Sequence, residues 1–266
     1  MFEEFYGFTR TPFSRAIPTD CLYRGNDSDE LIERLKWAAK RQLFAIMTGD
    51  SGTGKTTALR RFHDELQNAQ YRVLYMSDSK MTPLTFYKGI LKQLGFESKH
   101  SRSEAKRQLH KEIEIMKGVH NLFPVVIVDE AHLLDREMLE EIRFLLNYKM
   151  DSENPMALIL AGQTELREQL KLQSYAAIRQ RIDVQCGIGH LDRHQTAEYI
   201  RTHLDYADCQ KDIFSDAAID DIFQFSSGIP RLINKACTSS LLYGAQNKKS
   251  IIDDRMAKLV MECELS

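Results

Sequence analysis

The feature that most constrains the fold is a glycine-rich string, GDSGTGKT, which runs from Gly49 to Thr56. It follows the apolar segment LFAIMTG at residues 43–49 and precedes a helical pattern over residues 57–67. A loop of this kind between a strand and a helix can wrap its backbone N–H groups around a phosphate chain, and the helix N-terminus adds a favourable dipole. The alternative is a plain glycine-rich turn, which does not require the Lys-Thr ending.

The same pattern assigns roles to single residues of the string. We expect Lys55 to reach the β and γ phosphates and the Thr56 hydroxyl to bind Mg²⁺. The predicted cofactors are therefore ATP and Mg²⁺. The predicted ATP-binding residues of this segment are Gly49, Asp50, Ser51, Gly52, Thr53, Gly54, Lys55, Thr56 and Thr57.

Strand and helix patterns alternate along residues 1–189, which predicts an α/β core with a parallel sheet covered by helices on both faces. From residue 190 only helical patterns remain, which predicts a small all-helical lid over residues 190–266. We assign residues 1–28 to the core as an N-terminal segment. The expected strands are 43–49, 72–76, 123–130, 156–162 and 183–188, and the expected core helices are 29–40, 57–67, 84–94, 103–117 and 136–147.

Composition limits the cellular compartments and the binding partners that this chain can be expected to have. The 266 residues include 36 basic and 38 acidic side chains, for a formal charge of -2, so any DNA binding must come from a local patch. No apolar run approaches the ~18 residues of a membrane helix, and the acidic start MFEEFYGFTR is unlike a signal peptide. The five scattered cysteines predict neither a disulfide framework nor a zinc site. We expect a cytoplasmic protein without a membrane partner.

Two carboxylates, Asp129 and Glu130, end the apolar segment FPVVIVDE. We expect Asp129 to join Thr56 in the Mg²⁺ shell and Glu130 to polarise the attacking water as a general base. An acidic pair at a strand end can also be a solvated turn, but the glycine-rich loop disfavours that interpretation. Residues 129–132 spell DEAH, the name of a class of helicases. No second motor domain accompanies the string, so we assign it no role.

Four further polar residues are candidates for the catalytic site. Gln163 directly follows the segment MALILAG and can touch the γ phosphate or the water. Arg179 and Arg181 precede the last strand and can reach the γ phosphate of a neighbouring subunit, where a planar guanidinium neutralises charge. Arg231, in GIPR, can couple the lid to the nucleotide. For each, an ordinary surface or strand-end role is the alternative.

A basic segment runs from Phe86 to Lys111. Its charges predict a DNA-binding surface, and Lys99, Arg102 and Lys106 share one side if a helix begins early. A solvated basic helix is the alternative. The predicted DNA-binding residues are Lys88, Lys99, Arg102, Lys106 and Arg107.

Over essentially the whole chain, the order of motifs resembles that of the AAA+ ATPases. The motifs are the glycine-rich loop, the Asp-Glu strand end, the polar residue after the next strand, the arginine pair and GIPR. The segments EEFYGFTRTPFS, YRGNDSDELIERL, VDEAHLL and AGQTEL are similar to the ExeA, TnsC and IstB-like group of bacterial AAA+ proteins. This resemblance implies that Tyr23 to Gly25 line the adenine pocket and that Arg181 is the arginine finger. Gln163 departs from the Asn, Ser or Thr commoner at its position.

The resemblance implies one of two functions. The first is a DNA-transposition helper, an ATP hydrolase that forms a ring or helical filament on double-stranded DNA, without sequence preference, and recruits or regulates a transposase for target-site selection. The second is an ExeA-like secretion or envelope-assembly ATPase, which continues past the lid into a membrane span. Because this chain ends at Ser266 without such a span, we expect the first. A P-loop kinase is a third alternative, which the lid and the arginine pair disfavour.

Overall fold

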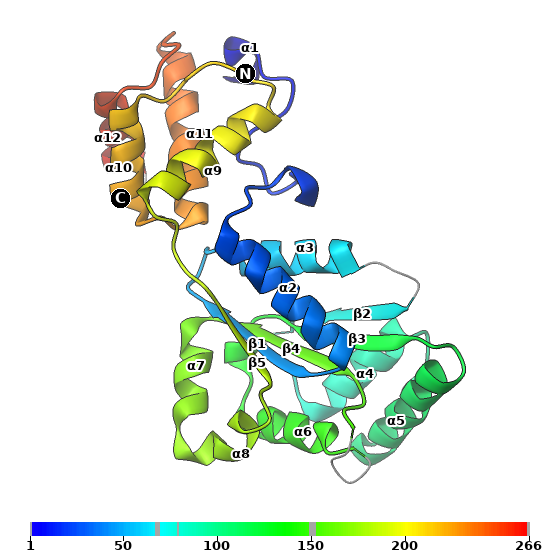
Figure 1. The fold of residues 1–266 in the computed structure, drawn as a ribbon. Coiled ribbons are helices and arrows are strands. Elements are labelled where there is room, and N and C mark those ends of the chain that lie inside the picture. Colours follow the sequence, from blue (N-terminus) through cyan, green and yellow to red (C-terminus); the bar gives the residue numbers. More distant parts are fainter. Residues whose placement is uncertain (1, 67–69, 79, 149–152, 265–266) are drawn as a thin grey trace. The chain divides into compact units, whose positions relative to one another are not determined.

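Five parallel strands form the central sheet, in the order β2-β3-β4-β1-β5 (Figure 1). The computed structural model describes residues 2–66, 70–78, 80–148 and 153–264. The predicted α/β fold with a parallel sheet is confirmed. The strands are β1 (Phe44–Gly49), β2 (Tyr71–Met76), β3 (Phe123–Val128), β4 (Ala157–Gly162) and β5 (Val184–Ile188).

The central strands are apolar on both faces, as expected where helices cover a parallel sheet on both sides. Every residue of β1 and β4 is buried, whereas the edge strand β2 exposes Arg72 and Tyr75. Leu158 of β4 is in register with Phe44 of β1 on one side and Val126 of β3 on the other. The carboxyl ends of β1, β4 and β3 therefore lie next to one another.

Helices form a layer on each face of this sheet (Figure 1). One layer packs Leu35 and Phe62 against the sheet, and the other packs Phe86, Leu109 and Leu145. The first layer consists of α2 (Asn26–Arg41) and α3 (Lys55–Leu66), and the second of α4 (Pro83–Gln93), α5 (Arg102–Gly118), α6 (Arg136–Leu146), α7 (Thr164–Lys171) and α8 (Ala176–Arg179). The sequence analysis did not predict α7 and α8, and residue 67 of the expected helix 57–67 lies outside the described residues.

The chain divides into two compact units, each with its own core. The α/β unit comprises Asp27–Asp50 and Lys55–Ile188, and the helical unit comprises Met1–Asn26, Ser51–Gly54 and Gly189–Ser266. We had placed residues 1–28 in the α/β core, but Phe2, Phe8 and Phe13 are buried in the core of the helical unit. The helices of that unit are α1 (Phe2–Tyr6), α9 (Arg193–Tyr206), α10 (Asp216–Ser226), α11 (Pro230–Gln246) and α12 (Asp254–Glu264).

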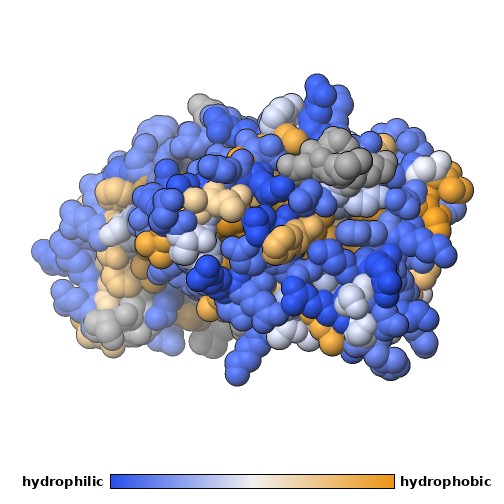
Figure 2. Space-filling model, turned by 90° about the horizontal axis from the view of Figure 1, so that it is seen from below, coloured by the Kyte–Doolittle hydropathy of each residue, from blue (hydrophilic) through white to orange (hydrophobic). Residues whose placement is uncertain are grey.

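The helices of the described residues are short or carry many polar side chains. None of these helices combines the length and the apolar character that crossing a membrane requires. The face of the molecule drawn in Figure 2 is mostly hydrophilic, with apolar side chains in small separate groups.

Candidate nucleotide-binding site

Three segments with polar residues follow three neighbouring strands. The glycine-rich loop follows β1, Asp129 and Glu130 follow β3, and Gln163 follows β4, which lies between the other two. Because the carboxyl ends of parallel strands share one edge of the sheet, the fold brings these side chains to one place. A ligand crevice at this edge is the usual arrangement in open α/β sheets.

The backbone of the loop requires glycine at two positions. Gly52 has φ +87° and Gly54 has φ +101°, a left-handed conformation that L-residues rarely adopt. At Gly52 a Cβ atom would also lie 2.9 Å from Cβ of Arg231 and 3.1 Å from Cγ2 of Ile229. The loop therefore depends on glycine both for its turn and for the close approach of residues 229–231.

Within the helical unit, Arg231 contacts the loop directly. Its backbone N–H donates to the carbonyl oxygen of Gly52 at 3.2 Å, and Nη1 of its guanidinium donates to Oγ of Ser51 at 3.3 Å. Arg231 is the second residue of α11, after Pro230, which is favoured in the first helical turn because it has no N–H to satisfy there. A cation placed here is suited to bind the phosphates that the loop is built to hold.

Lys55 begins α3 and is almost completely buried. Its Nζ donates to the carbonyl oxygens of Gly49 and Asp50, both at 2.8 Å. The carboxylate of Asp50 in turn accepts a hydrogen bond from the hydroxyl of Thr164, the first residue of α7. Two backbone carbonyl groups thus hold the ammonium group inside the loop.

The next residue of α3 reaches the end of β3. Thr56 Oγ1 donates to Oδ2 of Asp129 at 3.0 Å, and Tyr75, from the edge strand β2, donates its hydroxyl to the same oxygen at 2.8 Å. Burial, followed by this bond, raises the pKa of Tyr75, so it stays a protonated donor. Tyr75 was not among the site residues predicted from the sequence, although its place near the end of the strand beside β3 is a signal for it.

Glu130 differs from Asp129 in backbone and in exposure. Its φ is +53°, in the left-handed region where a residue with a side chain is strained, by on the order of 1–3 kcal/mol. Its N–H donates to Oδ1 of Asp129 at 2.9 Å, while its own side chain is 48% exposed. This turn separates two adjacent carboxylates, one buried and hydrogen-bonded and the other facing outward, which suits different roles.

The oxygen atoms at this edge fit a magnesium nucleotide. The Thr56 hydroxyl and the Asp129 carboxylate, 3.0 Å apart, are the hard oxygen ligands that Mg²⁺ prefers. The glycine-rich backbone and the Lys55 ammonium lie beside them and are suited to a phosphate chain. The residues present therefore fit both groups.

The two arginines before β5 are not equivalent. Arg179 Nη1 donates to the carbonyl oxygens of Leu170 at 3.1 Å and Lys171 at 2.6 Å, which end α7. A guanidinium bound to the last carbonyls of a helix acts as a C-terminal cap. The structure thus gives Arg179 a local structural role. Arg181 lies two residues further on, half-buried, and remains the candidate for an action on a neighbouring subunit.

Tyr23 belongs to the helical unit, where it contacts α9. Its hydroxyl donates to Oε2 of Glu198 at 3.0 Å, and its ring lies edge-on to Tyr199, with 6.0 Å between the ring centroids. Gly25 lies against the Tyr23 ring, because a Cβ atom there would be 3.4 Å from it. Its expected place in an adenine pocket stays a prediction.

The basic segment differs from what its sequence suggested. Helix α5 begins at Arg102, since Ser101 Oγ caps it by accepting from the N–H of Glu104. Lys99 therefore precedes the helix and does not share a helical face with Arg102 and Lys106, which corrects our expectation. Lys88, Lys99 and Arg107 are exposed.

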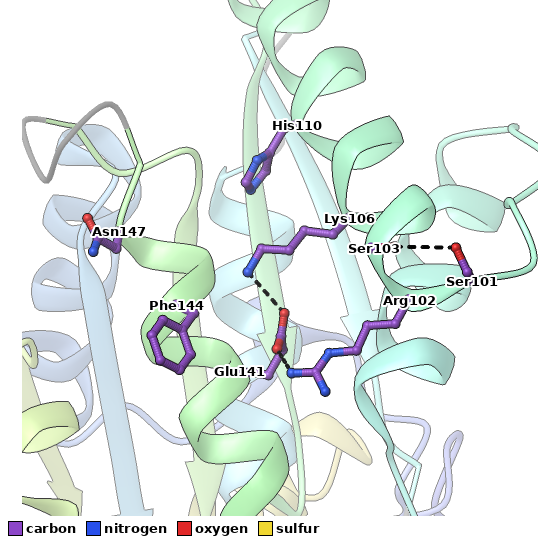
Figure 3. Close-up of a pocket in the computed structure, with 8 residues that line it drawn as sticks. All are labelled: Ser101, Arg102, Ser103, Lys106, His110, Glu141, Phe144 and Asn147. Carbon is purple, nitrogen blue, oxygen red and sulfur yellow. Dashed lines mark hydrogen bonds and ion pairs between the residues drawn. The ribbon is translucent and has the colours of Figure 1, made fainter.

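Arg102 and Lys106 extend from α5 toward one carboxylate of α6, Glu141 (Figure 3). The Glu141 side chain is only 3% exposed and accepts from Arg102, from the Tyr87 hydroxyl and, at 3.1 Å, from Lys106 Nζ. Burial by itself raises the pKa of this carboxyl, but the three hydrogen bonds outweigh it and hold the pKa below its ordinary value. These two basic residues line a groove of about 770 Å³ between α5 and α6 and are engaged within the chain.

Comparison with known proteins identifies the family to which this site belongs. A family described as an AAA domain matches residues 38–170, half of the chain. General secretion pathway protein A of Aeromonas hydrophila is 28% identical over 249 residues, which cover 91% of this chain. The chain spans only 44% of the length of that relative.

Several solved structures share the fold at low sequence identity. Cdc6p from Pyrobaculum aerophilum has a TM-score of 0.69 at 17% identity, covering 90% of this chain and 67% of the other. Drosophila ORC bound to DNA has a TM-score of 0.68 at 16% identity, covering 98% and 64%. The RuvB Holliday junction branch migration motor of Thermotoga maritima has a TM-score of 0.61 at 19% identity, covering 91% and 69%.

Proposed function

The chain belongs to the AAA domain family and is an ATP hydrolase, and we propose that it is a nucleotide-dependent switch whose ATP-bound form assembles on a macromolecular partner. The observation that carries this proposal is the shared edge of β1, β4 and β3, where the buried Asp129, hydrogen-bonded to Thr56, lies beside an outward-facing Glu130. ATP and Mg²⁺, when bound, supply the transferable phosphoryl group and the positive charge that neutralises it.

Different residues of this chain would bind the phosphates, bind the metal ion and activate the water. The backbone N–H groups of residues 49–57 and the Lys55 ammonium would hold the phosphates, and Thr56 with Asp129 would hold the metal ion. Glu130 would accept the proton of the attacking water, since 48% of its side chain is exposed and can meet water. Gln163 would orient the water or the γ phosphate from the strand between them.

Residues outside this edge would link the nucleotide to assembly. Arg231, bonded to Ser51 and Gly52, would respond to the phosphate state of the loop. Arg181 would act on the nucleotide of a neighbouring subunit in a homo-oligomer, a ring or a helical filament, and neutralise charge as the phosphate leaves. Arg179 would support it by keeping the end of α7 in place.

For the partner, our first candidate is double-stranded DNA, bound without sequence preference, with a transposase that is recruited or regulated at the target site. The exposed cations Lys88, Lys99 and Arg107 support it, together with the resemblance of the sequence to transposition helpers. Structural likeness to ORC bound to DNA and to the RuvB motor agrees with a DNA-bound ATPase. This candidate works in the cytoplasm, without a membrane.

The second candidate is an ATPase of secretion or envelope assembly. One specific observation favours it: the relative that covers 91% of this chain is a general secretion pathway protein. Engagement of Arg102 and Lys106 by Glu141 also leaves a smaller basic surface for DNA than the sequence suggested. The two candidates share the ATPase site and differ only in what the assembled form binds.

A paired binding assay separates the candidates. The full chain, loaded with ADP or with a slowly hydrolysed ATP analogue, is mixed with a labelled 50-base-pair duplex or with vesicles of anionic phospholipid. A DNA-bound switch retains duplex in the ATP state, releases it in the ADP state and does not float with vesicles. Absence of duplex binding in both nucleotide states, with ATP turnover intact, would rule out the first candidate and leave the second.

A further inference from the structure

His132 lies at the point where the segment after β3 meets the end of β4. It belongs to a short 3₁₀ helix, η2 (Ala131–Leu133), which begins directly after Glu130. At Gly162, the last residue of β4, a Cβ atom would lie 3.0 Å from the backbone nitrogen of His132. The absence of a side chain at Gly162 therefore lets η2 approach the strand end and brings His132 beside Gln163.

The two ring nitrogens of His132 face two different candidate residues. Nδ1 lies 3.6 Å from Oε2 of Glu130, and Nε2 lies 3.0 Å from the side-chain amide nitrogen of Gln163. The backbone N–H of Gln163 also points to Nδ1, at 3.4 Å. The imidazole is only 12% exposed, so these neighbours rather than water determine its hydrogen bonding.

A neutral imidazole has one donor and one acceptor nitrogen, and this links the two sides of the ring. With the proton on Nδ1, the ring faces the Glu130 carboxylate with a donor, and Nε2 accepts from the Gln163 amide N–H. With the proton on Nε2, Nδ1 accepts from the backbone N–H of Gln163, and the Gln163 side chain must present its oxygen. The orientation of the Gln163 amide is thus tied to whether Glu130 has a donor beside it.

We propose that His132 is a positioning residue for ATP hydrolysis, which fixes the Glu130 carboxylate and the Gln163 amide in orientation relative to each other. The imidazole itself needs no contact with the nucleotide. Its effect passes through two residues that follow neighbouring strands, β3 and β4, and makes them act as one unit. This inference rests on the proposed roles of Glu130 and Gln163.

The test compares kcat, KM and nucleotide affinity for substitutions of His132. We expect His132→Ala to lower kcat on the order of tenfold, with KM for ATP and the affinity for a fluorescent nucleotide changed less than about twofold, because the phosphate cradle is untouched. Asparagine can place a polar atom near Nδ1 and glutamine one near Nε2. His132→Asn and His132→Gln should therefore each recover part of the loss. Leu133→Ala, at the half-exposed next residue of η2, is the matched control and should keep the parental kcat.

A double-mutant cycle tests the coupling itself. If His132 and Gln163 act as a unit, the kcat of His132→Ala/Gln163→Ala should lie close to that of the weaker single variant rather than at the product of the two losses. Independent, multiplicative losses, or a parental kcat in His132→Ala, would overturn the proposal. Circular dichroism and the thermal midpoint check folding. If His132→Ala does not fold, the cycle is run with His132→Asn and the same criterion.

Glu130→Gln separates this inference from the proposed function. Full turnover in Glu130→Gln contradicts the general base and with it the wider proposal. Loss of turnover in Glu130→Gln together with parental turnover in His132→Ala contradicts the positioning role alone.

Discussion

Charged side chains gather at two places in the α/β unit, the carboxyl edge of the sheet and the groove between α5 and α6, and they are satisfied in different ways. At the edge, the neutral partners include two carbonyls for Lys55 and two hydroxyls for Asp129. In the groove, Glu141 is held by opposite charges, Arg102 and Lys106. A hydrogen bond to a neutral group is exchanged for a ligand contact more easily than a buried ion pair is broken. The edge is therefore suited to binding, and the groove to stability.

The largest effects are expected from substitutions at the edge. Lys55→Ala should abolish nucleotide binding because it removes the only side-chain cation expected to reach the phosphates from within the loop. Glu130→Gln should keep nucleotide affinity and lower kcat on the order of a thousandfold, since it removes the base and leaves the cradle. Fluorescent-nucleotide titration and phosphate release measure the two quantities. Turnover in Glu130→Gln equal to that of the parent would reject Glu130 as the base.

The next largest effect concerns Arg181, the half-buried arginine that precedes β5. Arg181→Ala should bind ATP normally and lose roughly a hundredfold in kcat, as expected when one donor to developing charge is removed. Mixing it with Lys55→Ala should restore part of the activity, because an interface with Arg181 from one chain and Lys55 from the other is complete. Sizing confirms assembly of the mixture. A mixture that assembles without regaining turnover contradicts action between subunits.

The groove predicts the opposite behaviour, a loss of stability without a loss of chemistry. Glu141→Gln should lower the free energy of unfolding by about 2 kcal/mol, since it removes a buried charge partner of Arg102 and Lys106, while kcat changes less than about twofold. Glu137→Gln is the matched control, because this second partner of Arg102 is 64% exposed and its pair contributes ~1 kcal/mol or less. A larger loss of stability in Glu137→Gln than in Glu141→Gln would contradict the structural role of Glu141.

The stability lost in Glu141→Gln should depend on pH with a sign that follows from the pKa of Glu141. Since the folded pKa of Glu141 is lowered, its charged form contributes stability above the ordinary pKa of 4.5, and this contribution disappears as pH falls through the lower folded value. The difference in thermal midpoint between the parent and Glu141→Gln should be full at pH 7 and should shrink below about pH 4. A difference that persists unchanged at pH 3 would mean that the glutamine acts through packing rather than charge.

The contrast between the sheet edge and the α5–α6 groove also explains which elements and site residues the sequence could predict. The central strands β1, β3 and β4 are recognisable because buried parallel strands are apolar on both faces, and the residues that follow them meet at one edge by topology. Helix α7, with the sequence TELREQLK, has only two buried residues, Leu166 and Leu170, so its apolar pattern is weak. The short helix α8 has only one.

Side-chain partners between distant elements were beyond the sequence analysis. The pairs of Arg102 and Lys106 with Glu141 join residues 39 and 35 positions apart, and no local spacing marks them. His132 was visible in the DEAH string, yet its contact with Gln163 depends on η2 approaching Gly162. Arg179 resembled Arg181 in sequence, and its contact with the end of α7 depends on where the fold places that helix.

The smallest expected effect concerns DNA binding by the exposed cations outside the groove, Lys88, Lys99 and Arg107. Each phosphate that a protein cation neutralises contributes about -0.9 to the slope of log K against log salt. Replacing the exposed Lys88, Lys99 and Arg107 with glutamine should therefore flatten the slope by up to about 3 units per protomer. Replacing Arg102 and Lys106 should flatten it by less than about 1 unit, because their charges are already offset by Glu141 and Glu137.

Fluorescence anisotropy of a labelled duplex across a salt series measures these slopes, with the protein loaded with the slowly hydrolysed ATP analogue. ATP dependence is expected from avidity, since an oligomer repeats a weak patch along the DNA. Lys40→Gln with Arg41→Gln is the matched control: it removes two exposed cations of α2, in the helix layer on the opposite face of the sheet from α4 and α5. A slope that responds as strongly to this control as to the triple variant would mean that net charge, not this surface, governs binding. A larger response to Arg102 and Lys106 would mean that DNA displaces Glu141, and the groove would then be a binding surface like the edge.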